Sequence, residues 1–259
     1  MKPAIVLLHS SMSSKAQWAA LVEQLTPDFR CIPLDLLGYG GAPYPPGADQ
    51  DEAYTHTLAH EADAITAALA AHLAPDEAFH LVGHSFGGAS ALHLARRMPQ
   101  RIRTLTLFEP VAFHLLPEDD AARVEIVTVV GRIMACATDR DATRIFIDYW
   151  NRPGSFDAAP TSAQDKMIAQ IAKVKLDFQA LLGEPVTLAD LAVLTMPALV
   201  LSGQHSPAST RSLAARLATA LPNAQALQTR GGHMGPITHG DAVNPVIAAF
   251  QRGELITEG

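Results

Sequence analysis

Short apolar runs alternate along the chain with stretches in which apolar residues recur every three or four positions. Unbroken apolar runs of four to eight residues are typical of strands buried on both faces of a parallel sheet. The pattern predicts strands over residues 4–8, 31–36, 79–82, 104–108, 198–201 and 224–228. It predicts helices over residues 15–25, 60–73, 89–98, 210–221 and 245–250. Because strands and helices alternate with short connections, we expect an α/β fold with about six mainly parallel strands flanked by helices.

The alternation of strands and helices breaks after residue 110. From there to about residue 194 the apolar residues keep a helical spacing, which predicts helices over residues 121–137, 142–150 and 162–182. A long helical segment between two strands of one sheet is an insertion into the core domain. We therefore predict an α/β core domain formed by residues 1–112 and 195–259, with a helical cap at residues 113–194.

The stretch from residue 79 to residue 90 contains the motif with the clearest chemical meaning. Gly83-His84-Ser85-Phe86-Gly87 matches the pattern G-x-S-x-G, and it follows a predicted strand and precedes a predicted helix. In such a nucleophile elbow, the serine stands on a sharp, strained turn with its hydroxyl exposed at the edge of the sheet. The two glycines have no Cβ, which lets the strand and the helix approach closely. Ser85 is therefore the candidate nucleophile.

Composition and charge narrow the class of protein. The 259 residues, 48% of them hydrophobic, are enough for one large α/β domain with an inserted sub-domain. The formal net charge of -7 and the absence of a basic cluster in the sequence argue against nucleic acid and against an anionic membrane surface as partners. Two cysteines and no apolar run of membrane-spanning length favour a reduced, cytoplasmic protein.

Four motifs together resemble the α/β-hydrolase superfamily. In the family's order along the chain, they are His9-Ser10-Ser11, the loop 35–41, the elbow around Ser85, and Gly232-His233. The resemblance implies the α/β-hydrolase fold, and it implies that His233 is the base that takes the proton of Ser85. A base is needed because a hydroxyl group is a weak nucleophile at neutral pH.

The acid of the triad departs from the commonest pattern of the family. Many relatives place an aspartate shortly after the strand that is 198–201 here, but this chain has Ser206 at that position. Some relatives, including a branch of haloalkane dehalogenases, place the acid one strand earlier, which implies Glu109 here. The strand 104–108 should lie beside the elbow strand and end on the same edge of the sheet. Glu109 is therefore the predicted acid, and the alternative is a glutamate that caps a helix or anchors a loop.

The resemblance also implies an oxyanion hole. By family position its donors are the backbone N–H groups of Ser11 and Phe86. Bulky apolar residues in the cap segment predict an apolar pocket for a small acyl or alkyl group. Four residues beside these loops or at a cap turn are the candidate substrate-binding residues: Ser10, Met12, Trp150 and Met234.

A serine nucleophile with an oxyanion hole favours acyl transfer to water, whereas the dehalogenases and epoxide hydrolases of this superfamily attack with a carboxylate. We expect a carboxylesterase-like serine hydrolase that cleaves a small ester, thioester or lactone through an acyl-enzyme. The sequence leaves open a C–C bond hydrolase of diketone-like substrates, a lyase that uses His233 as base, and a non-catalytic ligand receptor. No cofactor or metal motif is visible, so we expect a small-molecule substrate, no cofactor, no metal, and a monomer or homodimer.

Overall fold

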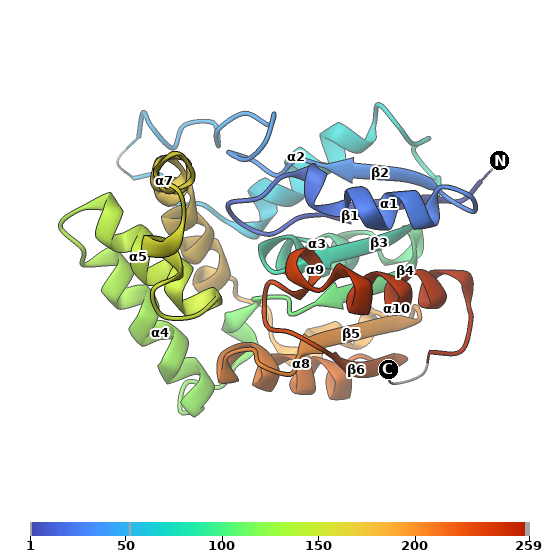
Figure 1. Ribbon diagram of the computed structural model, residues 1–259. Helices are drawn as coiled ribbons and strands as arrows, with labels where there is room; N and C mark the ends of the chain where they lie inside the picture. The colour runs from blue at the N-terminus through green and yellow to red at the C-terminus, as the bar shows by residue number, and fades with distance from the viewer. Residues whose placement is uncertain (1, 52, 257–259) are drawn as a thin grey trace.

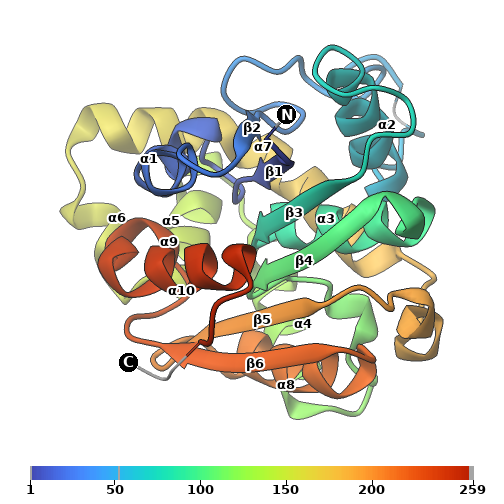
Figure 2. The same cartoon turned by 90° about the vertical axis from the view of Figure 1, so that its right-hand side faces the viewer.

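A single parallel sheet forms the centre of the molecule. The computed structural model describes residues 2–51 and 53–256, and within them six strands pair in the order β2-β1-β3-β4-β5-β6, each parallel to its neighbours (Figure 2). The α/β fold with six parallel strands is thus confirmed. The strands are β1 (Ala4–Leu8), β2 (Arg30–Leu34), β3 (Phe79–His84), β4 (Ile102–Phe108), β5 (Ala198–Gly203) and β6 (Ala224–Thr229).

Helices cover both faces of the sheet (Figure 2). On one face, α1 (Ala19–Leu25) packs beside α10 (Gly240–Arg252), and on the other face α2 (Leu58–Leu69) packs beside α3 (Phe86–Arg97), with α8 (Ala208–Ala220) against β5. Short helices complete the connections: η1 (Lys15–Trp18), η2 (Pro99–Arg101), η3 (Phe113–Leu115), η4 (Leu188–Val193) and α9 (Gly235–Thr238).

The packing of β1 explains why apolar and polar residues do not alternate in its sequence. Successive strand residues point to opposite faces, and Ile5 and Leu7 join the apolar cluster beneath α1 and α10. Val6 and Leu8 join the larger cluster on the other face, beneath α2 and α3. Both faces of the strand are therefore covered, and all five residues of β1 are fully buried.

Four α-helices lie between β4 and β5 in the described chain and gather at one end of the sheet (Figure 1). Side-chain caps start two of them, because Asp120 accepts a hydrogen bond from Ala122 N and Thr138 accepts one from Asp141 N. Gly154, with a φ of 85°, turns the chain in the left-handed region between the second and third helices. The helices are α4 (Ala121–Met134), α5 (Asp139–Trp150), α6 (Ser155–Ala158) and α7 (Thr161–Gly183).

Some helix boundaries differ from those that the apolar spacing predicts. The last helix begins at Gly240 rather than at Pro245, which lies inside α10. A proline lacks the backbone N–H and is typical of helix starts, so the sequence pattern placed the boundary too late. The short helix α6 was not predicted. In the part of the chain that the structure describes, no helix has the length and apolar character needed to cross a bilayer.

Burial keeps two histidines of the fold uncharged. Desolvation lowers the pKa of His114 from 6.5 to about 4 and has the same effect on His80. The unfolded chain takes up protons at these groups as the pH falls below 6.5, whereas the folded chain does so only near pH 4. The free energy of unfolding is therefore highest above pH 6.5 and falls as the pH drops towards 4.

We expect His114→Gln to flatten this fall in stability. The glutamine amide can still donate to the Leu181 carbonyl, which lies 3.1 Å from His114 Nδ1, but it takes up no proton. The loss of stability between pH 6.5 and 4 should shrink by at most about 3 kcal/mol. Urea unfolding curves at a series of pH values measure it, and identical pH dependence in variant and wild type would contradict the interpretation.

Candidate active site

Ser85 occupies a strained turn between β3 and α3. Its φ of 56° and ψ of -122° are unusual for a residue with a side chain. The strand ends at His84 and the helix begins at Phe86, so Ser85 alone forms the corner. Its backbone N–H donates to Phe108 O at 3.0 Å, which ties the corner to the end of β4. This geometry presents the serine hydroxyl at the carboxyl edge of the sheet.

The glycines of the motif are required by close backbone contacts. A Cβ at Gly83 would lie 2.5 Å from Gly87 O, and a Cβ at Gly87 would lie 2.4 Å from His9 O. The neighbouring atoms belong to the backbone and cannot move aside as a flexible side chain could. The pattern G-x-S-x-G therefore reflects the distance at which α3 crosses β1 and β3.

A chain of hydrogen bonds links the three predicted triad residues. His233 Nε2 lies 2.9 Å from Ser85 Oγ, and His233 Nδ1 lies 2.7 Å from Glu109 Oε2. All three side chains are buried. An ionised carboxylate can only accept a hydrogen bond, so Nδ1, which faces Glu109, is the ring nitrogen that carries the proton. Nε2 then has no proton and accepts from the serine hydroxyl. The arrangement can therefore transfer the serine proton to the imidazole.

Glu109 is held in place by its neighbours on β5. Its second carboxylate oxygen accepts a hydrogen bond from Gly203 N at 2.7 Å, and its backbone N–H donates to Leu201 O at 2.9 Å. Ser206, at the position where many relatives carry the acid, has a buried hydroxyl with no hydrogen-bond partner among the described residues. The carboxylate that faces the histidine thus stands directly after β4 and not after β5.

Backbone strain gathers around these residues. Within residues 2–51 and 53–256, the non-glycine residues with positive φ are Met12, Ser85 and Glu109, at 57°, 56° and 42°. Each such residue costs on the order of 1–3 kcal/mol, and strained residues cluster at functional sites. All three belong to the loops that surround His233 and the serine hydroxyl, so the strain marks the same edge of the sheet as the hydrogen bonds.

Among the described residues, the backbone N–H groups of Phe86 and Ser11 have no acceptor. Phe86 is the first residue of α3, and the first N–H groups of a helix have no partner inside it. The Ser11 N–H donates no hydrogen bond to any residue that the structure describes. Its neighbour Ser10 is held by η1, because Ser10 N and Oγ both donate to Gln17 Oε1, at 3.2 and 2.9 Å. Both predicted oxyanion donors therefore have an unused N–H.

His84 supports the loop that carries the base. It packs at the elbow, and its Nε2 donates to His233 O at 2.8 Å. Gln17 Nε2 lies 3.1 Å from His84 Nδ1 and donates to it. Burial lowers the pKa of His84 well below 6.5, and the neighbouring His233 adds to the effect. The neutral His84 thus connects both site loops through Gln17, a residue that no sequence motif marks.

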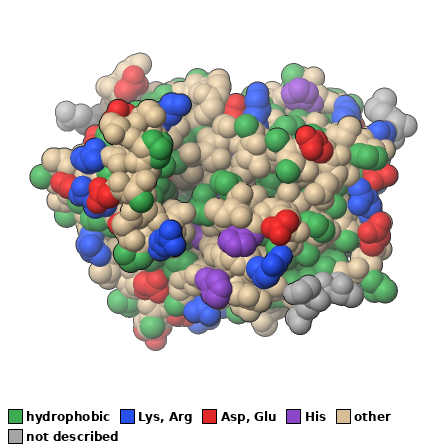
Figure 3. Space-filling view, in the orientation of Figure 1, with side chains coloured by type: hydrophobic (Ala, Val, Ile, Leu, Met, Phe, Trp, Pro, Cys, Tyr) green, Lys and Arg blue, Asp and Glu red, His purple; other side chains and the backbone are tan. Residues whose placement is uncertain are grey.

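A cavity of about 260 Å³ opens over the serine. On the surface, the molecule is hollowed between the α-helices that follow β4 and the rest of the molecule (Figure 3). The ring of Trp150 lies 4.1 Å from that of His233, centroid to centroid. All four predicted substrate-binding residues line the cavity, and no Asp, Glu, Lys or Arg of the described chain does. The other lining residues include Phe146, Ile147, Met167 and Ile237.

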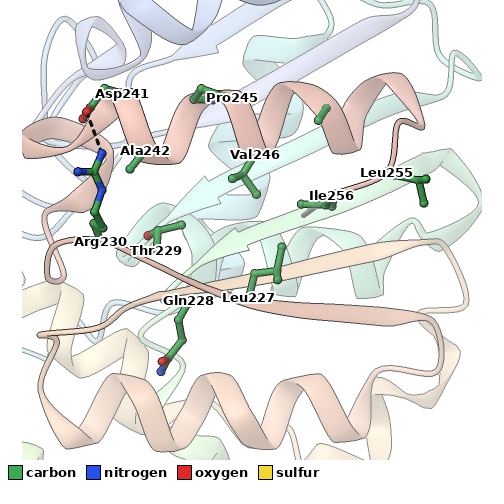
Figure 4. Close-up of a pocket in the computed structure, with 11 residues that line it drawn as sticks. Leu227, Gln228, Thr229, Arg230, Asp241, Ala242, Pro245, Val246, Leu255 and Ile256 are labelled. Atoms are coloured by element: carbon green, nitrogen blue, oxygen red, sulfur yellow. Dashed lines mark hydrogen bonds and ion pairs between the residues drawn. The ribbon is translucent and has the colours of Figure 1, made fainter. Parts of the chain in front are cut away.

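A second cavity, of about 440 Å³, lies between β6 and α10 (Figure 4). Its walls include Leu227 and Val246, and the Arg230–Asp241 ion pair lies at one end. It contains none of the three hydrogen-bonded residues. The smaller cavity over Ser85 is therefore the candidate active site.

The family model for the alpha/beta hydrolase fold matches residues 3–240. The chain belongs to the α/β-hydrolase family. A pimeloyl-[acyl-carrier protein] methyl ester esterase from Xanthomonas campestris pv. campestris is 29% identical over 269 residues, covering 96% of this chain and 94% of the relative. The comparison supports the assignment of this hydrolase as esterase-type.

Solved structures agree with this fold. A thermophilic esterase from Thermogutta terrifontis superposes with a TM-score of 0.74 at 23% identity, covering 98% of this chain and 90% of the other. An enol-lactonase from Burkholderia xenovorans LB400 gives a TM-score of 0.75 at 19% identity, covering 97% and 92%. At these identities, the likeness shows that the hydrolase shares its fold with both enzymes.

We expect Gly87→Ala to destabilise the hydrolase by more than about 2 kcal/mol, because the new Cβ would overlap backbone atoms of β1. Gly131→Ala in α4 is the matched control, since a Cβ there meets no atom within 4 Å. The control should stabilise the protein by up to about 1 kcal/mol through helix propensity. Urea unfolding measures both changes, and equal effects of the two substitutions would contradict the close-contact argument.

Proposed function

We propose that this hydrolase is a serine esterase that cleaves a small, neutral ester through an acyl-enzyme on Ser85. The observation that carries the proposal is the hydrogen-bonded chain from Glu109 through His233 to Ser85, which ends at the floor of the apolar cavity. The acid, base and nucleophile are then in the order that acyl transfer needs. The Xanthomonas relative, which is named an esterase and aligns with nearly the whole chain, supports the same reaction class.

In the first half of the reaction, Ser85 Oγ attacks the carbonyl carbon of the ester while His233 Nε2 takes the hydroxyl proton. The carbonyl oxygen becomes an oxyanion, which the Ser11 and Phe86 N–H groups stabilise. His233 then gives its proton to the departing alcohol as the C–O bond breaks, which leaves the acyl group on Ser85. Glu109 stabilises the imidazolium and holds its Nδ1 proton throughout.

In the second half, a water molecule attacks the acyl carbon. His233 takes one proton from the water, and a second tetrahedral oxyanion forms in the same position. Its collapse releases the carboxylic acid, and the proton on His233 returns to Ser85 Oγ. The step restores the free enzyme and consumes one water molecule per ester.

The cavity indicates the class of substrate. Its volume of about 260 Å³ and its lining of Met, Phe, Trp and Ile side chains suit a short acyl chain. A charged acyl group would lose its hydration there without an opposite charge to replace it. The Xanthomonas relative is named for a methyl ester, whose alcohol part is small, on a pimeloyl group that an acyl-carrier protein bears. Thioesters and lactones offer the same carbonyl and belong to the proposed class.

We expect Ser85→Ala to lower kcat for 4-nitrophenyl acetate by at least about 10³-fold, because it removes the nucleophile. Mass spectrometry of the wild type treated with a phosphonate ester should find one adduct, on Ser85. A variant with wild-type activity would overturn the acyl-enzyme. Wild-type protein that binds the ester but shows neither turnover nor adduct would make the site a receptor pocket.

We expect Glu109→Gln to lower kcat by about 10²–10⁴-fold, because the imidazolium loses its counter-charge and the favoured tautomer changes. Glu184→Gln is the matched control, since Glu184 is also a buried carboxylate paired with a histidine, His93, at 3.2 Å, but away from the site. The control should keep kcat within about threefold. Full activity of Glu109→Gln, in protein with a wild-type circular dichroism spectrum, would remove Glu109 from the triad.

A further inference from the structure

A buried charged cluster joins the inserted helix α7 to the core helix α2. We define it by Lys173 and Asp177, one turn apart on α7, and Glu61 on α2. Lys173 Nζ lies 3.0 Å from Glu61 Oε1 and also contacts the Asp177 carboxylate. The three side chains are between 0% and 2% exposed. Breaking such a cluster leaves an uncompensated buried charge, so its members hold α7 firmly against the core.

The cluster already contains its own cation. His56, Glu61 and Asp177 present metal-ligand atoms within 4.8 Å of one another, but Lys173 Nζ contacts two of these three residues. Burial alone would lower the pKa of Lys173, and the carboxylates of Asp177 and Glu61 outweigh it and raise the pKa above 10.5. The ammonium also faces the ring of Phe86 at 4.6 Å. Lys173 therefore supplies one permanent positive charge that the two carboxylates share.

One oxygen of the cluster faces the site loop. Asp177 Oδ2 accepts two hydrogen bonds of 2.6 Å, one from Ser11 Oγ and one from Tyr39 OH. Ser11 belongs to the loop after β1 that carries a predicted oxyanion donor, whereas Tyr39 belongs to the connection between β2 and α2. The same carboxylate thus binds one residue of the site and one residue outside it, through equivalent groups.

The Ser11 peptide is fixed from two sides. Its neighbour Ser10 is bound to Gln17 on η1, and its own side chain is bound to Asp177 on α7. The next residue, Met12, has a φ of 57°, a conformation that relaxes unless the surroundings hold it. Ser10 O, on the same planar peptide as the Ser11 N–H, accepts from His9 Nδ1 at 2.7 Å and from Ser13 N at 3.3 Å. The hydrogen bond to Asp177 adds the contact that holds the Ser11 side chain from α7.

We infer that Asp177 is a positioning residue for the oxyanion hole, which acts by holding Ser11 Oγ so that the Ser11 N–H points at the developing negative charge. The inference rests on the proposed function. On this inference, α7 supports catalysis as well as the packing of the fold. Donors that are already oriented stabilise the transition state without reorganisation, and this effect appears in kcat more than in KM.

The two hydroxyl groups on Asp177 Oδ2 allow a matched comparison. Ser11→Ala and Tyr39→Phe each delete one 2.6 Å hydrogen bond to the same buried oxygen, so both should lower the melting temperature. We expect Ser11→Ala to lower kcat for 4-nitrophenyl acetate by about tenfold, with KM within about twofold. We expect Tyr39→Phe to keep kcat within about twofold, because it leaves the aromatic ring against His9 and leaves Ser11 Oγ bound to Asp177.

A double-mutant cycle tests the route through Asp177. Asp177→Asn should lower kcat as Ser11→Ala does, and the double variant should lose no more than the larger single loss, because both changes affect the same contact between Ser11 Oγ and Asp177 Oδ2. Additive losses, unchanged kcat in Ser11→Ala, or equal kcat losses in Ser11→Ala and Tyr39→Phe would each overturn the inference. Ser85→Ala separates a failure of the positioning role from a failure of the proposed function. If Ser85→Ala is inactive while Ser11→Ala matches wild type, only the positioning role fails.

Discussion

The hydrogen bonds from Glu109 through His233 to Ser85 are the interaction on which the arrangement of the site depends. The three residues lie far apart in the sequence, and each follows a different strand of one parallel sheet. In a parallel sheet, all carboxyl ends open on the same edge, so loops from distant parts of the chain meet there. The two core clusters make the sheet rigid enough to keep the atoms of the three side chains within hydrogen-bond distance.

Strain is the cost of presenting these groups. Met12, Ser85 and Glu109 all adopt left-handed backbone conformations that residues with side chains avoid. Two of them are held by hydrogen bonds to neighbouring strands, from Ser85 N to Phe108 O and from Glu109 N to Leu201 O. The close-packed glycines of the elbow have the same origin, since they let α3 start immediately after the serine.

Buried polar groups connect the site loops to the rest of the molecule from two directions. From the core, Gln17 joins Ser10 to His84, and His84 in turn binds the backbone of His233. From the inserted helices, Asp177 binds Ser11, and Trp150 lies against the ring of the base. The helices between β4 and β5 thus do more than enclose a cavity, because they contact both the donor loop and the histidine.

The sequence by itself determined the strands, the elbow and the order of the motifs, because these depend on local periodicity and on short spacings. It also pointed to Glu109, since a carboxylate between an apolar strand and a proline is conspicuous, and the structure places it against His233. Gln17, Lys173 and Asp177 had no such signal: in an amphipathic helix, charged residues predict a solvated face. Only the tertiary structure buries Lys173 against Glu61, 112 residues away, because long-range pairing depends on how helices pack and leaves no periodic pattern.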